Sequence, residues 1–513
     1  MVQFVRQGLV TYYYGEQKEI KVIFEALTVF IEGAVFSTKY KNGWDGNARF
    51  YNKAAGCFWY GLIERVLDAL SKRRIEYVVE GYEDLPTEWI QFSDKFLSKE
   101  RTYQRNAIQA WFERGYGTIM IPTRGGKTFV ASEIIRLLNE REKRQLRTLF
   151  LVDNVDLFNQ AINDISLITG IKAEDIGKIR GTDFQPKSVN IGMIQTIQSA
   201  LKGKVTKKSY TKQDVIEATQ RKHKMKIFLK ELEFIIIDEV QEYGSSKPRL
   251  EALRQMTSLS HILSISATPY RYKNLIHQLN VDGFSGGVVY EIHEKELVKN
   301  EVLAESRILL LLFEHFVKKY QQASTYQDVV EKLVISNASR NGVILGMLAL
   351  CDSLGLKTLA MFNSVKHGKI ISSLSGYSFL SGEDDENTRD KMKKHFLSES
   401  GGVLLVSDIW KKGITLPSVE ILFNVDGGKE ASLVIQRRGR VLGTTDSKKK
   451  ALTIDFIDLN APYLGDHSLS RINAYETKID SSLIDVIDTR KSAFISDLEE
   501  YLINWFELNI QNG

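Results

Sequence analysis

Hydrophobic residues along most of this chain form short unbroken runs that alternate with segments of helical period. Between residues 96 and 290 the pattern predicts helices such as Phe129–Asn139 and Asp156–Ile168, and strands at Thr118–Ile121, Thr148–Val152, Ser188–Met193, Phe234–Ile237 and His261–Ser266. A second series between 291 and 465 predicts strands at Thr358–Phe362, Gly402–Val406, Ile421–Val425 and Lys450–Asp455. Continuous apolar strands separated by helices indicate parallel sheets covered on both faces. We therefore predict an α/β fold with two tandem parallel-sheet lobes.

The two ends of the chain show different patterns. Residues 1–95 predict a small α+β domain with a helix at Gly61–Lys72 and strands at Leu9–Tyr14, Lys21–Phe24, Thr28–Ile31 and Arg49–Tyr51. The tail, residues 466–513, is amphipathic, and we expect it to be helical at Leu483–Val486 and Phe494–Phe506. The predicted domains are therefore 1–95, 96–290, 291–465 and 466–513.

Composition narrows the class of protein. The 513 residues are 43% hydrophobic and 26% charged, which is close to the average of globular proteins. Two cysteines exclude a disulfide framework and a cysteine-based zinc site. The first thirty residues lack a signal-peptide pattern, and the longest apolar run, Ile308–Phe313, is too short to cross a bilayer. We expect a monomeric cytoplasmic protein with no membrane partner.

The net charge of +5 comes from one region. Residues 201–230 carry two acidic residues, Asp214 and Glu217, against ten basic ones: Lys202, Lys204, Lys207, Lys208, Lys212, Arg221, Lys222, Lys224, Lys226 and Lys230. We expect this cluster to be an insertion on the first lobe that binds a polyanion, with a solvated surface loop as the alternative.

A glycine-rich segment follows the predicted strand Thr118–Ile121 and precedes a helix. It reads Pro-Thr-Arg-Gly-Gly-Lys-Thr over residues 122–128. In such a loop the backbone N–H groups and Lys127 bind phosphates, and the hydroxyl of Thr128 is a ligand for Mg²⁺. One position departs from the usual pattern, because Ile121 stands where the first glycine is expected.

Two adjacent carboxylates end the predicted strand Phe234–Ile237. Asp238 and Glu239 begin the segment Asp-Glu-Val-Gln, and in a parallel sheet they lie at the edge where nucleotides bind. Asp238 is suited to hold Mg²⁺, and Glu239 to orient and deprotonate an attacking water. The sequence therefore predicts a site for ATP and Mg²⁺.

In combination, these motifs resemble those of superfamily 2 helicases. Asp-Glu-Val-Gln, ending at Gln241, resembles the family's D-E-x-[HQ] box, and Ser266–Pro269 resembles its S-A-T motif. Gln436–Arg440 resembles the motif that carries arginine fingers, Val406–Gly413 the fifth motif, and Phe362–Ser364 the fourth. The motifs occur in family order over about 360 residues. The resemblance implies RecA-like lobes and ATP-dependent helicase activity.

The resemblance also implies roles for individual residues. Arg101 and Gln104 would recognise adenine, and the nucleotide would further contact Thr123, Arg124, Gly125, Gly126, Lys127, Thr128 and Gly413. The residues implied in catalysis are Lys127, Asp238, Glu239, Gln241, Gln436, Arg437 and Arg440. The family's second arginine finger is replaced by Gly443, so either Arg437 or Arg438 compensates or Arg440 acts alone.

The N-terminal residues narrow the resemblance. Asn42–Gly46, followed by Arg49-Phe50 and then Phe58–Ile63, resembles the N-terminal domain of UvsW-type phage recombination helicases, which unwind and branch-migrate forked and four-way DNA. The implied partner is forked or branched DNA with single-strand/duplex junctions. Trp44 would stack on a base or insert at a junction, with an ordinary core position as the alternative, and Arg49 would belong to a basic patch. Family position implicates Asn154, Thr196, Ser364 and Ser407 on the single strand. A phage-encoded protein of this kind would be located in the host cytoplasm.

Other functions fit parts of the pattern. A double-strand DNA translocase would hydrolyse ATP without separating strands. An RNA helicase is disfavoured by the Asp-Glu-Val-Gln box and the N-terminal unit. A nucleotide-gated DNA-binding protein with little turnover is compatible with Ile121 and Gly443. The leading hypothesis is an ATP-dependent helicase of branched DNA that serves recombination, repair or replication and moves 3′ to 5′.

Overall fold

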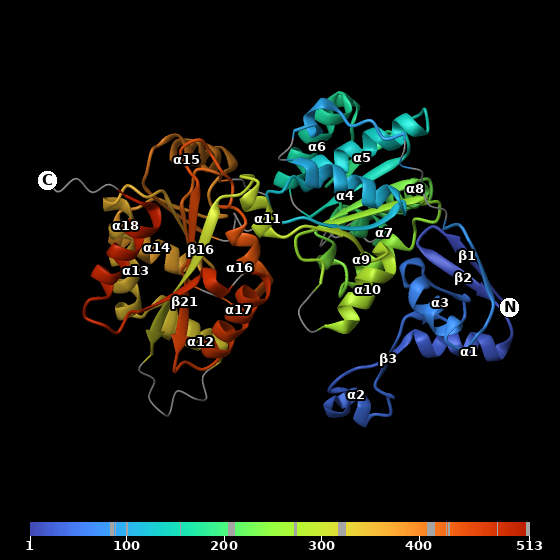
Figure 1. The fold of residues 1–513 in the computed structure, drawn as a ribbon, viewed down its shortest axis with the longest axis horizontal. Helices are drawn as coiled ribbons and strands as arrows, with labels where there is room; N and C mark the ends of the chain where they lie inside the picture. Colours follow the sequence, from blue (N-terminus) through green and yellow to red (C-terminus); the bar gives the residue numbers. More distant parts are fainter. Residues whose placement is uncertain are drawn as a thin grey trace. The chain divides into compact units, whose positions relative to one another are not determined.

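The computed structural model describes residues 1–82, 87, 89–98, 101–153, 155–203, 211–270, 274–315, 325–407, 416–426, 428, 431–479 and 481–508. Its contacts divide the chain into two compact units (Figure 1). The first comprises Met1–Pro122 and Gly126–His293, and the second comprises Thr123–Gly125 and Glu294–Gly513. The fold is mixed α/β with a parallel-sheet lobe in each unit, as predicted.

An eight-stranded sheet forms the centre of the first unit, in the order β11-β10-β12-β9-β13-β14-β8-β15. All pairings are parallel except that of β10 with β11. The strands are β8 (Tyr116–Met120), β9 (Thr148–Val152), β10 (Gly177–Arg180), β11 (Asp183–Gln185), β12 (Val189–Met193), β13 (Phe234–Asp238), β14 (His261–Ser266) and β15 (Val288–Glu291).

Helices cover both faces of this sheet (Figure 1). One face carries α4 (Thr102–Phe112), α5 (Lys127–Arg141) and α6 (Val155–Thr169), and the other carries α7 (Ile194–Lys202), α9 (Lys247–Leu253) and α10 (Leu275–Ser285). The basic region contains a further helix, α8 (Lys212–Lys230), rather than a loop over those residues. Predicted basic residues Lys204, Lys207 and Lys208 lie outside the described residues.

The N-terminal residues form a second, five-stranded sheet in the order β5-β6-β2-β1-β7. Its strands are β1 (Val2–Gln7), β2 (Val10–Tyr14), β5 (Tyr51–Asn52), β6 (Cys57–Trp59) and β7 (Tyr77–Glu80), and its helices are α1 (Gln17–Ala26) and α3 (Ile63–Ser71). The predicted strand Lys21–Phe24 is wrong, because these residues lie within α1. Ile20, Ile23 and Leu27 are spaced three and four apart and pack on the core, which is the helical period.

The N-terminal sheet is packed tightly onto the first lobe. One hydrophobic cluster runs from Val2 and Phe4 through Trp59 to Phe284 of α10. A Cβ atom at Gly61 would lie 2.0 Å from the carbonyl oxygen of Asp282, so only glycine allows this approach. The two predicted domains 1–95 and 96–290 thus have separate sheets but a shared core.

A small projection extends from the N-terminal sheet. It contains β3 (Thr28–Phe30), a short 3₁₀ helix (η1, Ala34–Phe36), α2 (Thr38–Lys41) and β4 (Asn47–Arg49). β3 and β4 pair only with each other, in an antiparallel two-stranded sheet. Figure 1 shows α2 standing away from α1 and α3.

The second unit is built on a seven-stranded, fully parallel sheet in the order β18-β19-β17-β20-β21-β16-β22. Its strands are β16 (Glu305–Glu314), β17 (Thr358–Phe362), β18 (Phe379–Leu380), β19 (Val403–Ser407), β20 (Ile421–Asn424), β21 (Lys450–Leu459) and β22 (Ile484–Asp488). Its helices are α11 (Glu294–Lys299), α12 (Tyr326–Val330), α13 (Ala338–Ser353), α14 (Val365–Ser375), α15 (Glu386–Ser398), α16 (Ala431–Arg438), α17 (Leu464–Lys478) and α18 (Phe494–Phe506).

The tail of the chain is not entirely helical. Leu483–Val486, predicted to be helical, falls mostly in β22, which pairs with β16 and extends the sheet. The run Ile-Asp-Val-Ile-Asp alternates at its start, and the edge of the sheet supplies the backbone partners that make it a strand. α18 spans the predicted Phe494–Phe506.

No single helix in the described part of the chain has the length and hydrophobicity needed to cross a membrane, although the bent pair Tyr326–Ile335 and Ala338–Ser353 meets both criteria jointly.

Candidate functional site

The carboxyl ends of β8, β13 and β14 meet at one edge of the first sheet. β14 lies between the other two strands, and all three are parallel. The loop that follows β8 is the predicted phosphate loop, Asp238 ends β13, and Ser266 ends β14. Residues separated by more than 100 positions are thereby brought to one edge, as the order of the motifs predicts.

The phosphate loop has the backbone of an anion-binding turn. Arg124 and Gly126 have positive φ angles of 75° and 79°, and α5 begins directly afterwards at Lys127. The N-terminal N–H groups of this 15-residue helix point toward the loop and carry partial positive charge. Ile121, which replaces the first glycine of the pattern, is fully buried and donates its N–H to Ser266. This position therefore packs in the sheet, and its side chain leaves the turn itself intact.

Gln104 lies directly against this turn. A Cβ atom at Gly126 would lie 2.4 Å from Nε2 of Gln104, which explains glycine at that position. The Gln104 side chain is fully buried, accepts a hydrogen bond from Arg101 Nη1 (3.5 Å) and donates one to the hydroxyl of Tyr103 (3.2 Å). Arg101 and Gln104 thus form one polar group beside the loop, as their predicted shared role requires.

The two carboxylates at the end of β13 differ in environment. Asp238 is 7% exposed and accepts a hydrogen bond from the N–H of Glu239 (3.0 Å). Burial raises the pKa of Asp238 to about 7; the Glu239 carboxylate adds to this rise and the Lys127 ammonium opposes it. A buried carboxyl of this kind is stabilised in its charged form by a nearby cation, so the residues fit a divalent metal beside Lys127.

A chain of hydrogen bonds links Glu239 to β14. Gln241 Nε2 donates to Glu239 Oε2 (2.6 Å), and Ser266 Oγ donates to Gln241 Oε1 (2.6 Å). Ser266 Oγ in turn accepts from the N–H of Thr268 (2.9 Å). Glu239 itself has a φ of 50°, which is unusual for a residue other than glycine. The orientation of the Glu239 carboxylate is therefore fixed by its neighbours.

Two further contacts at this edge of the sheet were not predicted. The imidazole Nε2 of buried His277 lies 2.7 Å from the carbonyl oxygen of Gln241, and Arg249 contacts Asp153 at 3.1 Å. Both interactions join residues from different elements, His277 lying on α10 and Arg249 on α9. No local motif marks them, because their partners become neighbours only in the folded sheet.

The three arginines of the predicted finger motif have different surroundings. Arg437 is fully buried and donates to Asn363 Oδ1 (2.6 Å) and Asn424 Oδ1 (3.5 Å). Arg438 donates through both terminal nitrogens to the Glu294 carboxylate (2.5 Å each). Arg440 is 5% exposed and lies just beyond the end of α16, whereas Gln436 within the helix is half-buried.

These contacts concern the second arginine finger of the family pattern, whose place is taken by Gly443 in this chain. Arg437 and Arg438 are both engaged inside the second unit, so neither is placed to compensate for Gly443. A Cβ atom at Gly443 would lie 3.2 Å from Cβ of Pro417, which leaves little room for a larger residue. The alternative in which Arg440 acts alone stays a prediction.

Arg437 is connected to the loop after β17. Asn363, its acceptor, donates its N–H to Asp426 Oδ2 (2.8 Å), and Ser364 donates to the same oxygen (3.0 Å). The other carboxylate oxygen of Asp426 contacts buried His367, whose Nε2 lies 2.9 Å from Asn341 Oδ1. A single carboxylate thus fixes the backbone of the predicted fourth motif.

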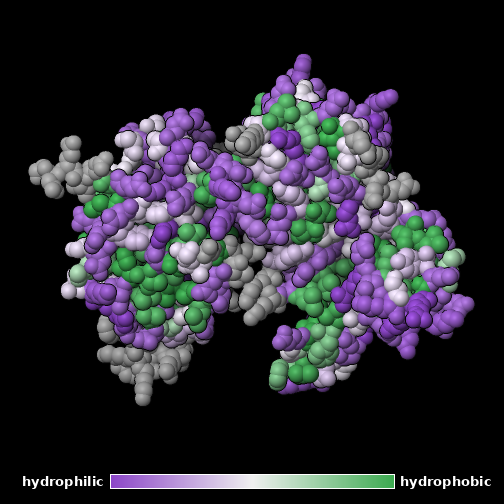
Figure 2. All heavy atoms as spheres, viewed as in Figure 1, coloured by the Kyte–Doolittle hydropathy of each residue, from purple (hydrophilic) through white to green (hydrophobic). Residues whose placement is uncertain are grey.

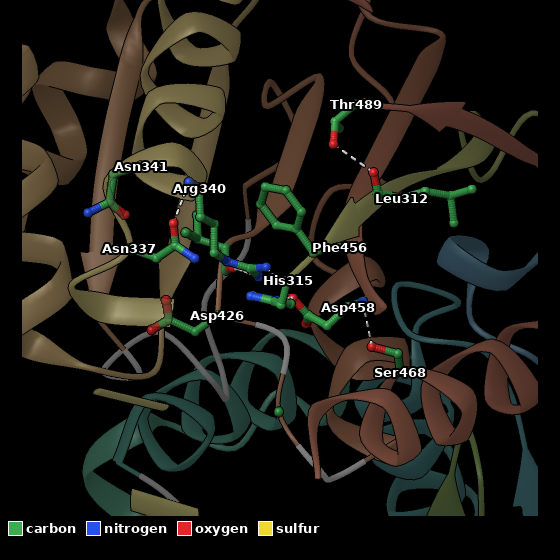
Figure 3. A network of polar contacts seen from close by, with 12 residues as sticks. Leu312, His315, Asn337, Arg340, Asn341, Asp426, Phe456, Asp458, Ser468 and Thr489 are labelled. Carbon is green, nitrogen blue, oxygen red and sulfur yellow. Dashed lines mark hydrogen bonds and ion pairs between the residues drawn. The ribbon is translucent and has the colours of Figure 1, made fainter. Parts of the chain in front are cut away.

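A second buried ionic group lies beside this one (Figure 3). Arg340 donates to Asp458 and to the carbonyl of Val425 (3.1 Å), and its guanidinium lies 3.9 Å from the ring centroid of Phe456. His315 Nε2 is 2.8 Å from the same Asp458. Because Arg340 and Asp458 are buried, their pairing is needed to offset the loss of hydration.

Comparison with known protein families decides the identity of this fold. Residues 97–271 match the model of the type III restriction enzyme res subunit, and residues 343–442 match that of the helicase conserved C-terminal domain. Together the two models match more than half of the chain. The chain belongs to the superfamily 2 helicases. The family predicted from the motifs is thus confirmed, and membership implies the use of ATP.

Individual relatives of the helicase are distant. A protein of Sulfurisphaera tokodaii named DNA 3′-5′ translocase XPB2 is 23% identical, over 86% of this chain and 98% of its own. A putative DNA 3′-5′ helicase Rad25 of Haloarcula marismortui is also 23% identical, over 67% of this chain, and the helicase spans half of that protein.

The fold is shared with a solved restriction-modification enzyme. The restriction-modification enzyme LlaBIII bound to DNA matches 85% of the helicase and 35% of its own chain, at 14% identity and a TM-score of 0.56. The crystal structure of T4 UvsW matches 95% of the helicase and 99% of its own chain, at 17% identity and a TM-score of 0.43.

The residues predicted to contact nucleic acid have varied exposure in the helicase. Ser364 caps α14, and Ser407 at the end of β19 is buried. Thr196 is 8% exposed, and its hydroxyl accepts the N–H of Gly181 (2.9 Å), so its side chain faces the protein rather than solvent. Asn154 and Gly413 lie outside the described residues.

The N-terminal pair, Trp44 and Arg49, lies on the projection. Trp44 is half-buried, and its N–H donates to the carbonyl of Lys39 (3.0 Å). Arg49 is exposed and forms an ion pair with Asp45, and this guanidinium lowers the pKa of Asp45 to about 2. On α8, Lys212, Lys224, Lys226 and Lys230 are exposed, so the helicase presents part of its basic cluster to solvent.

Proposed function

We propose that this helicase is an ATP-driven motor that unwinds and branch-migrates forked or four-way DNA. The observation that carries the proposal is the convergence of Lys127, Asp238, Glu239 and Gln241 at one sheet edge, with Glu239 oriented by hydrogen bonds. DNA as the partner is supported by the relatives named as DNA helicase and DNA translocase. Branched DNA is supported by the resemblance of the N-terminal residues.

In this proposal the residues of the first unit divide the work. Lys127 and the N–H groups of the loop bind phosphate oxygens, and Thr128 and Asp238 hold Mg²⁺. Bound Mg²⁺ would neutralise charge on the phosphates during transfer. Glu239 orients a water molecule and takes up its proton, and Gln241 holds Glu239 for this step. Arg101 and Gln104 bind the adenine.

In the second unit, we assign stabilisation of the γ-phosphate charge to Arg440. Gln436 belongs to the same motif as Arg440 and is assigned to catalysis with it. Arg437 positions the loop of Asn363 and Ser364. Ser364 and Ser407 are proposed to lie on the path of the single strand, and Trp44 and Arg49 to contact DNA from the N-terminal domain. The exposed lysines of α8 are proposed to bind duplex phosphates.

The second candidate is a DNA translocase that does not separate strands. It is favoured by the name of the Sulfurisphaera tokodaii relative, a DNA translocase, which matches this chain over 98% of its own length. The two functions share the ATP site and differ only in what movement does to the duplex. Movement from 3′ to 5′ is proposed for both.

Strand displacement separates these candidates. The wild-type helicase is given a labelled fork, a four-way junction and a triplex on linear duplex, each with ATP and Mg²⁺. We expect the fork and the junction to be resolved, and Glu239→Gln to bind them without resolving them. Displacement of the triplex strand together with intact forks would support the translocase, and failure on every substrate despite binding would reject a motor function.

A further inference from the structure

The projection formed by residues 28–49 has almost no interior of its own. Its two strands pair with each other alone, from Thr28 opposite Arg49 to Phe30 opposite Asn47. Ala34 is its buried hydrophobic residue, and added Cβ atoms at Gly33 and Gly43 would meet nothing within 4 Å. A two-stranded sheet of this size is marginal by itself, so the projection exists as an appendage of the N-terminal sheet.

Hydrophobic side chains nevertheless gather on this projection. Phe36 is 85% exposed, and Phe30, Val35 and Tyr40 are 52%, 43% and 37% exposed. Figure 2 shows hydrophobic and hydrophilic side chains mixed at this end of the first unit. Aromatic rings exposed together on a protruding element are typical of a binding surface, because they lose favourable burial until a partner covers them.

Basic residues lie next to these rings. Lys39 and Lys41 are on α2 and exposed; of the two acidic residues on the projection, Asp45 is paired with Arg49 and Glu32 is exposed, so residues 28–49 carry a net charge of +1. A surface that combines exposed aromatic rings with free-standing ammonium groups is complementary to nucleic acid with unpaired bases. The rings stack on bases of any sequence, and the lysines attract the phosphates between them.

We propose that the projection is the surface that binds unpaired bases where a DNA duplex opens into single strands. Phe36 stacks on a base, Val35 and Tyr40 widen the apolar surface, and Lys39 and Lys41 bind the adjoining phosphates. The proposal rests on the proposed function for its partner, DNA, and adds the part of the DNA that this surface recognises. A paired duplex offers no open base face except at its ends, so the preference is for junctions.

The test measures binding without ATP. The full chain is titrated with a fork carrying 2-aminopurine at the junction and with a blunt duplex of equal length, and Phe36→Ala is compared with wild type. We expect about tenfold weaker binding of the fork, loss of the 2-aminopurine signal change and unaltered binding of the duplex. Tyr14→Ala is the matched control, because Tyr14 is 56% exposed on the main N-terminal sheet and should leave all three readouts unchanged.

A double variant, Lys39→Ala/Lys41→Ala, tests the phosphate contacts. We expect weaker fork binding with a shallower salt dependence, and a retained 2-aminopurine signal at saturation. Wild-type affinity and signal in Phe36→Ala would overturn the proposal. So would a wild-type dimer that Phe36→Ala converts to monomers with fork binding intact, since the rings would then bind a second copy. Because these binding tests do not measure ATP hydrolysis, their result does not depend on whether the chain acts as a motor.

Discussion

At the scale of single residues, Arg437, Arg438 and Arg440 show how one short motif serves different purposes. Their sequence neighbours are the same, but Arg437 binds Asn363, 74 residues away, and Arg438 binds Glu294, 144 residues away. Burial lowers the pKa of Arg437, so its charge is retained at a cost that its polar partners offset. The sequence identifies the motif and cannot distinguish these roles, because the partners are set by the tertiary fold.

Alanine substitutions should separate the two kinds of arginine. Arg440→Ala is expected to reduce DNA-stimulated ATP hydrolysis about 10³-fold in the folded protein, since a transition-state contact is lost. Arg438→Ala is expected to lower the free energy of unfolding by about 3 kcal/mol, because Glu294 is left as an uncompensated charge. Denaturant unfolding and steady-state ATPase measure both effects, and Arg438→Met/Glu294→Leu should regain stability. Full ATPase activity in Arg440→Ala would refute its role.

His261 gives a pH dependence of stability. It packs against the rings of Trp111 and Phe234, and burial, assisted by the charges of Arg141 and Arg6, lowers its pKa to about 4. The unfolded chain, with an ordinary pKa near 6.5, therefore binds more protons between about pH 6.5 and 4. Its contribution to stability is present above pH 6.5 and is lost as the pH falls through this range.

Replacing the imidazole of His261 should weaken the pH dependence of the free energy of unfolding. We expect the stability difference between wild type and His261→Gln to shrink by about 2 kcal/mol on going from pH 7 to pH 4, in denaturant unfolding of the full chain. His223→Gln, at an exposed position of α8, is the control and should follow wild type. An identical pH dependence in wild type and His261→Gln would contradict the lowered pKa.

At the scale of elements, most buried apolar runs were predicted as strands, but the longest, Ile308–Phe313, was not, although it forms the middle of β16. The predicted bounds of β9, β14 and β17 agree with the structure because each strand is a buried apolar run in a parallel sheet. Lys21–Phe24 and Leu483–Val486 failed because a run of four residues fits either period. Tertiary packing decided both cases. Residues 21–24 became helical because α1 packs on the N-terminal core, and most of residues 483–486 became a strand because β22 pairs with the edge of β16.

The residues of the candidate site also differ in whether the sequence could predict them. Residues of the phosphate loop and of the segment 238–241 could be named from the sequence, because their spacing relative to strands is local. The partners His277, Glu294 and Asp426 could not, because each contacts its motif from a distant element. Thr196 was named from family position, yet its hydroxyl is taken up by Gly181.

The loop after β17 should depend on Asp426. Asp426→Ala removes the acceptor of two backbone N–H groups, so the segment of Asn363 and Ser364 loses its fixed geometry. We expect the concentration of single-stranded DNA that half-saturates ATPase to rise about tenfold, with activity without DNA within twofold of wild type. Asp446→Ala, at an exposed site in the same unit, is the control. Unchanged half-saturation in folded Asp426→Ala would show that this loop does not contact DNA.

At the scale of the whole molecule, the N-terminal domain and the first lobe form one compact unit. Their shared hydrophobic cluster and the close approach at Gly61 predict that they move together. A DNA-binding projection on that unit would therefore move with the residues that bind ATP. The near-neutral charge outside residues 201–230 fits this arrangement, because the proposed DNA contacts are few and local.

Gly61→Val should disrupt the packing of the N-terminal sheet against the first lobe. Its side chain would overlap the carbonyl of Asp282 and the backbone of Gly286, and we expect a loss of about 3 kcal/mol in unfolding free energy. Limited proteolysis should then cut between the two sheets faster than in wild type. Gly56→Ala, at a turn with open space, is the control, with a smaller loss caused by its positive φ alone. Equal rates of proteolysis in Gly61→Val and wild type would contradict the prediction that the N-terminal domain and the first lobe move together.

We propose that the edge formed by Lys127, Asp238, Glu239 and Gln241 hydrolyses ATP in response to branched DNA. The most direct measurement is the ATPase rate of the full chain with single-stranded, duplex, forked and four-way DNA and with RNA, side by side, with Lys127→Ala as the inactive control. We predict the largest stimulation by forked and four-way DNA and none in Lys127→Ala. No stimulation by any DNA, or a larger stimulation by RNA, would contradict the account.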